Sequence, residues 1–221
     1  MMKFFRRFRD LGISGNMARR YDIDSNEYRL EEMRGYAAEA AKHVTDGCSV
    51  LEIAPGPGYL SIELAKIGSY KITGMDISED FVKIAKQNAD RAGVDIEFLQ
   101  GNVSKIPMKD NTFDFIICTA AFKNFKEPIR ALTEMIRVLK PEKSALIIDM
   151  DRNATNDDLL KMIGKMGARG FSRFMQMTIF KELRSSAYTK DEFSNMLLQA
   201  GITNSNIRSI DGGLWVYMKK C

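Results

Sequence analysis

Residues 50–60 of this chain read VLEIAPGPGYL. The apolar run with one carboxylate, Glu52, predicts a buried strand over residues 49–54, and Gly56 and Gly58 predict a tight turn into a helix. Glycines at such a turn let a ligand approach the backbone closely, and the helix N-terminus offers free N–H groups. The stretch therefore predicts a strand, loop and helix that bind a ligand.

Strand and helix patterns alternate on both sides of this stretch. Strands are predicted at residues 49–54, 71–75, 96–100, 113–118 and 145–149, and helices at 30–44, 59–67, 79–92 and 128–139. Five such repeats indicate a doubly wound, Rossmann-like α/β fold with a mostly parallel sheet. A helix at 189–200 and strands at 203–208 and 214–219 follow. Asp211-Gly212-Gly213 between these strands is a hairpin signal, so one C-terminal strand is expected to be antiparallel.

Composition excludes several classes of protein. The 221 residues are 45% hydrophobic and 28% charged, which is ordinary for a soluble globular chain and excludes disordered and fibrous ones. No apolar run approaches the roughly 20 residues that cross a membrane, and no secretory signal is recognisable, so a cytoplasmic location is expected. The three cysteines, Cys48, Cys118 and Cys221, are too scattered for a disulfide framework, and no metal site is expected.

Charge divides the chain into parts. Residues 1–20 carry a net charge of +5 and residues 159–190 a net charge of +6, so the remainder carries −7. We expect a basic N-terminal arm or lid at residues 1–29. Residues 30–221 are expected to form a single domain with a helical cap insertion at about 150–187.

The expected cap is rich in residues that suit an adaptable apolar pocket, although the same residues also serve simple packing. They are Met150, Met162, Met166, Met175, Met177, Phe171, Phe174 and Phe180. Its arginines fit recognition of a carboxylate or phosphate, or a solvated basic face. They are Arg152, Arg169, Arg173 and Arg184.

The ligand of the glycine loop is constrained by the residues around it. The G-x-G-x-x-G loop of dinucleotide-binding proteins fits poorly, because Leu60 and Ser61 stand where its third glycine would follow. A carboxylate at Glu52 would repel a pyrophosphate and suits a ligand with an ammonium group, such as the methionine part of S-adenosylmethionine. Asp76 ends the second strand, where an acidic residue can bind ribose hydroxyls.

Four motifs together resemble the class I S-adenosylmethionine-dependent methyltransferases. They are VLEIAPGPGYL, GMDIS at residues 74–78, GNVSKIPMKDNTFDFIIC at 101–118 and RVLKP at 137–141. The nearest group is the small-molecule, type 11 kind that includes quinone methyltransferases. The resemblance covers residues 30–150 and more loosely 189–219, and it implies a seven-stranded sheet. The chain departs from the family at Ala54 and Glu142, where glycine is usual, and at Asn102, where aspartate is frequent.

The resemblance implies S-adenosylmethionine as the cofactor and a set of residues that bind it. Glu52, Ala54, Gly56 and Gly58 would form the loop that holds the methionine part, Asp76 would hold the ribose, Ile77 would pack on adenine, Asn102 and Val103 would meet the adenine amine, and Thr119 would lie near the methyl group.

Methyl transfer needs a base only when the nucleophile must lose a proton. Asp149 and Asp151 follow the fifth strand and are the candidates for acid–base or substrate-orienting roles, with capping and loop hydrogen bonding as the alternative. His43 lies before the first strand, so no catalytic role is expected for it. The Asn/Asp-Pro-Pro-aromatic turn of nucleic-acid amine methyltransferases is replaced here by Thr119-Ala120-Ala121-Phe122.

These observations favour methyl transfer, by in-line displacement, to a small-molecule acceptor that is anionic or partly apolar. Two alternatives stay open from the sequence. One is an RNA or protein methyltransferase that docks its substrate through the basic segments. The other is a nucleotide-binding module without catalytic activity.

Overall fold

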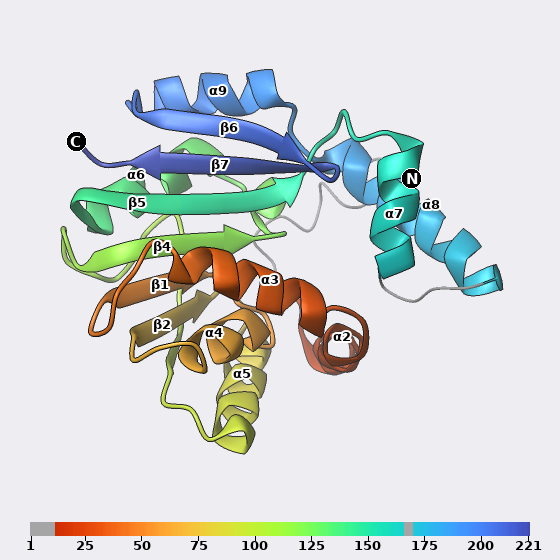
Figure 1. Ribbon diagram of the computed structural model, residues 1–221, viewed down its shortest axis with the longest axis horizontal. Helices are drawn as coiled ribbons and strands as arrows, with labels where there is room; N and C mark the ends of the chain where they lie inside the picture. The colour runs from red at the N-terminus through yellow and green to blue at the C-terminus, as the bar shows by residue number, and fades with distance from the viewer. Residues whose placement is uncertain (1–11, 166–169) are drawn as a thin grey trace.

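The structure is a computed structural model that describes residues 12–165 and 170–221. Its centre is a seven-stranded sheet in the order β3-β2-β1-β4-β5-β7-β6 (Figure 1). The strands are β1 (Ser49–Ile53), β2 (Lys71–Asp76), β3 (Glu97–Gln100), β4 (Phe113–Thr119), β5 (Leu139–Met150), β6 (Ser205–Ile210) and β7 (Gly213–Lys219). β1 to β5 run parallel, and β7 pairs antiparallel with both β5 and β6.

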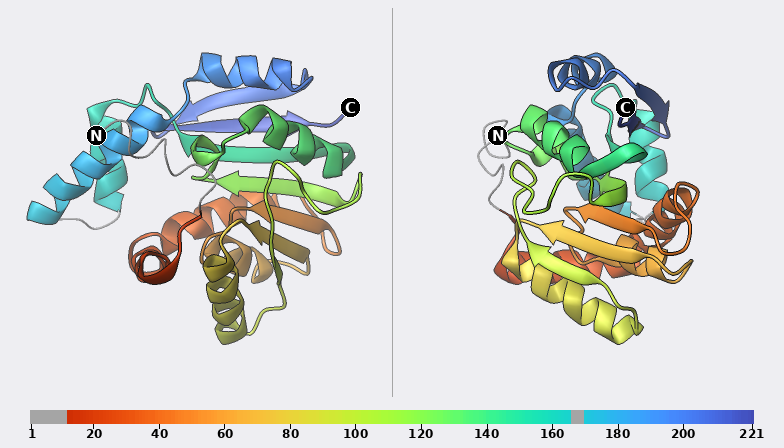
Figure 2. Two further views of the ribbon diagram at one scale, coloured as in Figure 1. Left: turned by 180° about the vertical axis from the view of Figure 1, so that it is seen from behind. Right: turned by 90° about the vertical axis from the view of Figure 1, so that its left-hand side faces the viewer.

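Helices cover both faces of the sheet, as Figures 1 and 2 show. One face carries α3 (Leu30–Ala41), α4 (Tyr59–Ala65) and α5 (Glu79–Ala92), and the other carries α6 (Pro128–Val138) and α9 (Lys190–Gln199). A hydrophobic core lies on each face of the sheet, and successive residues of β4 pack alternately into one core and the other. Phe115 and Ile117 pack with α3 and α4, whereas Ile116 and Cys118 pack with α6 and α9. The central strands are therefore buried on both sides, as their continuous apolar runs predict.

This architecture confirms the predicted fold class, including the antiparallel C-terminal hairpin. Asp211 and Gly212 both have positive φ angles, 49° and 76°, which is the geometry of a two-residue hairpin turn. The largest difference in element length is β5, whose 12 residues exceed the predicted 145–149. The first part of β5 pairs with β4 at Leu139, and lateral pairing of this kind leaves no signal in local sequence.

Among the described residues, three further helices lie beyond the carboxyl edge of the parallel strands. They are α2 (Gly15–Tyr28), α7 (Asn156–Lys165) and α8 (Gly170–Ser186). In Figure 1 all three lie on the right of the view, with α2 in the lower half and the α7–α8 pair in the upper half. The sequence predicted helices for the cap but no helix over residues 15–28, because α2 buries only Ala18 and Ser25.

Some predictions fall outside the described part of the chain. These are the basic residues at positions 3, 6, 7 and 9, and Met166 and Arg169. The side chains of Phe171, Arg173, Phe174 and Met175 are outside it as well. Within the described residues, the structure contains no helix that is long and apolar enough to span a membrane.

Candidate functional site

Glu52 is the charged residue at the centre of the candidate site. It lies on β1, its exposed fraction is 2%, and Ser61 of α4 donates a hydrogen bond to its carboxylate. Burial raises the pKa of Glu52 to about 7, and the hydrogen bond from Ser61 only partly offsets this. No described lysine or arginine contributes to this pKa, so the carboxylate lacks a cationic partner within the described structure.

The loop after β1 has an unusual backbone. Ala54, Gly56 and Gly58 have φ angles of 56°, 55° and 84°. Ala54, one of the departures from the family motif, occupies the left-handed region, and its N–H donates to Met75 O over 2.8 Å. Gly58 is restricted further, since a Cβ there would lie 2.9 Å from Phe98 Cζ. The glycine spacing therefore reflects backbone geometry and close packing at the start of α4.

Asp76 joins the end of β2 to this loop. Its Oδ2 accepts from Gly56 N over 3.0 Å and its Oδ1 accepts from Ser78 N over 2.8 Å. Its exposed fraction is 5%, and burial raises its pKa. At the end of β3, Asn102 Oδ1 accepts from Ser104 N over 2.8 Å and Val103 is buried. The predicted ribose and adenine residues thus follow neighbouring strands at one edge of the sheet.

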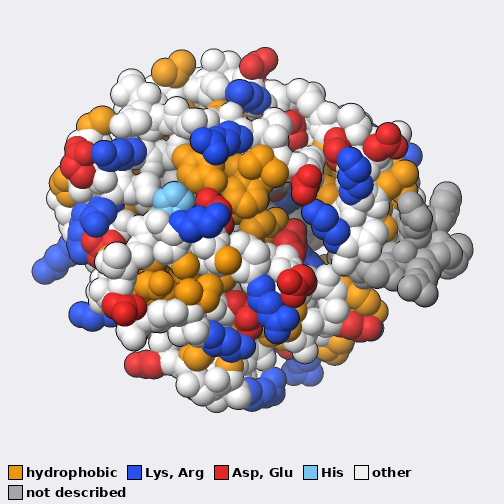
Figure 3. Space-filling model, in the orientation of Figure 1, with side chains coloured by type: hydrophobic (Ala, Val, Ile, Leu, Met, Phe, Trp, Pro, Cys, Tyr) orange, Lys and Arg blue, Asp and Glu red, His pale blue; other side chains and the backbone are white. Residues whose placement is uncertain are grey.

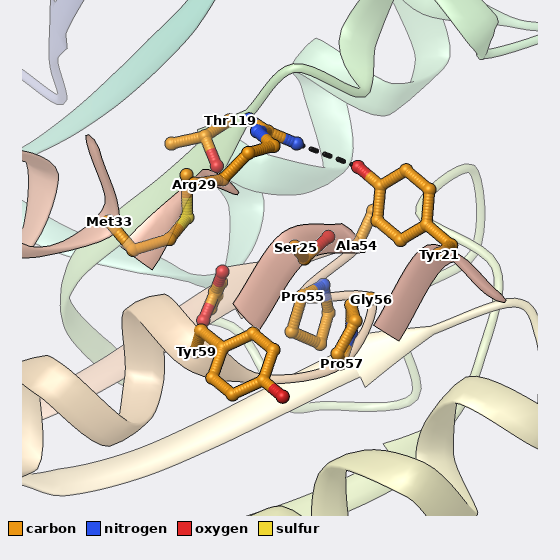
Figure 4. A pocket seen from close by; sticks show the side chains of 11 residues that line it. Tyr21, Ser25, Arg29, Met33, Ala54, Pro55, Gly56, Pro57, Tyr59 and Thr119 are labelled. Atoms are coloured by element: carbon orange, nitrogen blue, oxygen red, sulfur yellow. Dashed lines mark hydrogen bonds between the residues drawn. The ribbon is translucent and has the colours of Figure 1, made fainter. Parts of the chain in front are cut away.

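A pocket opens between the glycine loop and the N-terminal helices (Figure 4). It holds about 380 Å³ of space, part of it open to solvent. It is lined by Tyr21, Ser25, Arg29, Met33, Glu52, Ala54, Pro55, Gly56, Pro57, Tyr59 and Thr119. In Figure 4 the Arg29 side chain lies beside Thr119 and reaches toward Tyr21. The pocket therefore combines a buried carboxylate with an arginine.

Arg29 lies at the junction of α2 and α3 and is held in place. Its Nη1 donates to Tyr21 Oη over 2.7 Å, and its Nε donates to Glu32 Oε2 over 2.8 Å. The same Glu32 accepts from Tyr36 Oη over 2.9 Å. These two bonds use two of the five N–H donors of a guanidinium, so others stay available to a ligand.

The pocket unites four of the predicted residues, namely Glu52, Ala54, Gly56 and Thr119. The remaining predicted cofactor residues lie outside its lining. Two contacts join the start of the described chain to the residues that follow β2. Ser78 Oγ donates to Ile13 O, and a Cβ on Gly12 would lie 3.4 Å from Ile77 Cγ2. Residues 12 and 13 thus lie against the loop after β2.

The two aspartates predicted as acid–base candidates are both buried and both bonded within the protein. Asp149 forms an ion pair with Lys123 and accepts from the Lys123 backbone N–H. Asp151 accepts from Asn153 N over 2.8 Å and from Ser209 Oγ over 3.4 Å. An acid–base role for either residue stays a prediction.

Three described basic residues of the cap have partners within the protein. Arg152 pairs with Glu192, and Lys165 pairs with Asp211 over 2.9 Å. Arg184 donates to Ala154 O over 2.8 Å. In Figure 3 acidic and basic side chains are interspersed over the visible face, with no extended area of one sign. On that face, the described surface lacks the basic stripe that a nucleic-acid partner requires.

Sequence reasoning missed Arg29 and Lys123. Arg29 lies between two helices, directly after a polar helix with little hydrophobic periodicity, and Lys123 follows a strand in a stretch with no recognised motif. Neither carries a local signal, because each acquires its neighbours through tertiary structure.

Among the described residues, no cluster of three or more potential metal ligands occurs.

The chain is similar to known proteins over most of its length. A Demethylmenaquinone methyltransferase of Staphylococcus haemolyticus is 26% identical over 217 residues, which cover 90% of this chain and 87% of that protein. The counterpart from Staphylococcus aureus is also 26% identical, with the same coverage.

Two solved structures share the fold. One is a protein from Methanococcus maripaludis assigned as an S-adenosyl-L-methionine-dependent methyltransferase, with a TM-score of 0.75, 24% identity, and coverage of 95% of this chain and 97% of that one. The other is a SAM-dependent methyltransferase from Aquifex aeolicus, with a TM-score of 0.67, 22% identity, and coverage of 94% and 98%.

The sequence pattern of a family described as "Methyltransferase domain" matches residues 44–201. This match spans more than half of the chain and includes the glycine loop, Asp76 and β4. The chain therefore belongs to this methyltransferase domain family, and it is a class I S-adenosylmethionine-dependent methyltransferase.

Proposed function

We propose that this enzyme transfers the methyl group to a small, largely apolar acceptor of the quinone type. The observation that carries the proposal is the similarity to two demethylmenaquinone methyltransferases, which covers 90% of this chain and 87% of each of those proteins. The cap supports it with an apolar cluster at the carboxyl edge of the sheet. Its members are Met150, Ala154, Leu159, Ala187, Met162, Met177, Phe180 and Leu183.

The residues of the pocket fit the amino-acid end of S-adenosylmethionine. That end carries an ammonium and a carboxylate group. Glu52 is a buried carboxylate without a described cationic partner, and Arg29 is a cation in the same pocket. We assign the ammonium to Glu52 and the carboxylate to Arg29. Gly56 and Gly58 keep the loop close to the ligand.

The other half of the cofactor is assigned to the neighbouring strand ends. Asp76 would accept from the ribose hydroxyls, since each of its oxygens keeps a lone pair beyond its backbone bond. Ile77 would pack on the adenine ring, Asn102 and Val103 would meet the adenine amine, and Thr119 would stand by the methyl group.

Positioning supplies most of the catalysis in this proposal. When bound, S-adenosylmethionine supplies a methyl group on a positively charged sulfur, which is already a good leaving group. The residues of this chain hold the acceptor atom in line with that methyl group and exclude water, and such alignment alone is worth several orders of magnitude in rate. Asp149 and Asp151 remain the proposed proton acceptors for an acceptor that must lose a proton.

The acceptor assignment is tested with purified enzyme, S-adenosylmethionine and a reduced short-chain demethylmenaquinone. The expected product is heavier by one CH₂ unit and is detected by mass spectrometry. Total RNA and a protein mixture serve as competing acceptors in parallel reactions. Methyl incorporation into either of these, with none into the quinone series, would refute the proposal.

A first prediction concerns Arg29. Arg29→Ala is expected to raise the dissociation constant for S-adenosylhomocysteine by roughly 10- to 100-fold, because a charge-assisted pair contributes about 1.5–3 kcal/mol. Isothermal titration calorimetry measures it. Arg20→Ala is the matched control, since Arg20 lies on the same helix and pairs with Asp24 on an exposed surface. Equal affinities for wild type and Arg29→Ala would exclude the assigned contact.

A second prediction concerns the lid. We propose that residues 1–29 form a lid over the cofactor, and the described part of it is fastened through Asp22. Asp22 Oδ1 accepts from Tyr59 Oη over 2.9 Å and from Asn88 Nδ2 over 2.8 Å. Asp22→Leu is therefore expected to speed dissociation of S-adenosylhomocysteine at least roughly tenfold, because two hydrogen bonds to a charged group are lost.

Stopped-flow measurement of dissociation tests the lid. Asp24→Ala is the control, because Asp24 lies on the same helix and has Arg20 as its ion-pair partner. A dissociation rate of Asp22→Leu that matches those of the wild type and of Asp24→Ala would contradict the lid assignment. The proposed helical cap at residues 150–187 is the opposite border of the same site.

A further inference from the structure

The loop that follows β4 has a restrained conformation. Thr119 ends the strand and lines the pocket, and the next residue, Ala120, has a φ angle of 55°. Residues other than glycine rarely adopt this left-handed conformation. Ala120 N donates to Ile148 O of β5 over 2.7 Å, and the chain then enters a short 3-10 helix, η1 (Phe122–Asn124). Surrounding contacts must hold this loop, because Ala120 does not favour its own backbone geometry.

Lys123 supplies those contacts. Its Nζ donates to Ala120 O over 2.7 Å and to Asp149 Oδ1 over 2.8 Å. Its backbone N–H donates to Asp149 Oδ2 over 2.8 Å, and Asp149 Oδ1 also accepts from Met150 N over 2.7 Å. Lys123 and Asp149 thus tie the carbonyl of the strained residue, the start of η1 and the end of β5 into one closed set of bonds.

This pair lies in an apolar interior. The side chains of Lys123 and Asp149 are 6% and 5% exposed. The neighbouring residues Phe122 and Cys118 are fully buried. Desolvation of a buried ion pair offsets most of its attraction, so an apolar pair of similar volume often gives equal or greater stability. What an apolar pair cannot supply is a bond to the Ala120 carbonyl.

We propose that Lys123 is a positioning residue for methyl transfer, which holds the Thr119–Ala121 loop at the geometry that places Thr119 beside the methyl group. The proposal rests on the proposed function for the assignment of Thr119. Lys123 acts through the loop and contacts neither the cofactor nor the acceptor. It therefore affects alignment, and a misplacement of about 1 Å in an active site can lower the rate roughly 100-fold.

The test compares Lys123→Met with the double variant Lys123→Met/Asp149→Leu. The single variant leaves a buried aspartate unpaired, so a fall in both the melting temperature and kcat is expected. The double variant removes both charges, and we expect it to recover most of the melting temperature while kcat stays roughly 10- to 100-fold below that of Asp149→Asn, which lacks the proposed proton acceptor but keeps Lys123 and its bond to the Ala120 carbonyl. Lys109→Met, at an exposed lysine, is the control and should match wild type.

A purely structural role of Lys123 would make kcat of the double variant recover to that of Asp149→Asn together with the melting temperature, and that result would overturn the proposal. A second readout does not need the acceptor. Amide hydrogen exchange of the peptide that covers residues 119–125 is measured in protein saturated with S-adenosylhomocysteine. Faster exchange in the double variant, with β1 and β2 unchanged, is expected. Equal exchange in the double variant and wild type would overturn the proposal.

Failure of the proposed function gives a different pattern of results. In that case wild type transfers no methyl group to any quinone, while the exchange comparison still decides whether Lys123 restrains the loop.

Discussion

Substitution of Glu52 by glutamine is expected to raise the dissociation constant for S-adenosylhomocysteine roughly 100-fold at pH 7.5. A buried carboxylate that meets a ligand ammonium contributes about 2–4 kcal/mol when one partner is removed, and each 1.4 kcal/mol is tenfold in affinity. Glutamine keeps the shape of the side chain and an oxygen that can still accept from Ser61, so the change tests charge. Calorimetric titration measures the affinity.

The control for this experiment is Glu63→Gln. Glu63 lies on α4, two residues from Ser61, and pairs with Lys66 and Arg34 away from the pocket. Its substitution is expected to leave the affinity within about twofold of wild type, because Glu63 does not line the pocket. Equal affinities of all three proteins would show that Glu52 does not bind the ammonium.

The pKa of Glu52 adds a dependence on pH. Since this pKa is about 7 in the free protein, the carboxyl group is increasingly protonated below pH 7. A protonated carboxyl group must lose its proton before it pairs with an ammonium. The affinity of wild type is therefore expected to fall as the pH is lowered from 7 to 5, approaching tenfold per pH unit, whereas that of Glu52→Gln should stay flat.

The stability of the free protein should change in the opposite direction. The folded-state pKa of Glu52 lies above its unfolded value of 4.5, so the folded protein binds more protons between these two values. This contribution to stability is fully present below pH 4.5 and is lost as the pH rises through 7. Thermal melts of wild type and Glu52→Gln between pH 5 and 8 isolate it as the difference between the two curves.

Much of this fold is visible in local sequence. Buried parallel strands read as apolar runs, and the C-terminal turn requires residues that tolerate positive φ, which Asp211 and Gly212 provide. The glycine loop was predictable for a similar reason, because its backbone geometry restricts the residue types allowed. Ala54 shows that the restriction is not absolute, since an alanine occupies a left-handed position there.

The parts that could not be predicted depend on distant contacts. The helix α2 has little hydrophobic periodicity, and it is fixed by Gly15 N donating to Asp80 Oδ2 over 2.7 Å and by Tyr21 packing on Phe81. Arg29 enters the pocket only because α2 is placed there. Lys123 and Asp149 are 26 residues apart, and adjacent strand ends bring them together. Pairings of this kind leave no periodic or motif signal.

Substitution of Gly74 by alanine is expected to destabilise the protein by about 3 kcal/mol. Gly74 lies in the middle of β2, between Glu52 of β1 and Phe98 of β3. A Cβ at this position would lie 2.5 Å from Phe98 Cδ1 and 3.2 Å from Pro55 Cγ. Phe98 is 2% exposed and packs on a buried cluster, so its ring cannot move away without opening that cluster.

The lower stability of Gly74→Ala should appear as a melting temperature about 6–12 °C below that of wild type, for a chain of this size. Gly35→Ala is the control. Gly35 lies inside α3, and a Cβ there would meet nothing within 4 Å, so this substitution should stabilise by about 0.5–1 kcal/mol because alanine is the better helix former.

A double variant identifies the cause of the loss. Gly74→Ala/Phe98→Leu replaces the clashing ring with a smaller side chain, so it should be more stable than the sum of the two single losses predicts. Such non-additivity is expected for residues in contact, whereas the effects of distant, independent sites add. Strict additivity, or an unchanged melting temperature for Gly74→Ala, would contradict the contact on which the argument depends. Since Gly74 of β2 pairs with Glu52 of the neighbouring strand β1, the same measurement tests the packing behind the Glu52 side chain, which is proposed to bind the cofactor.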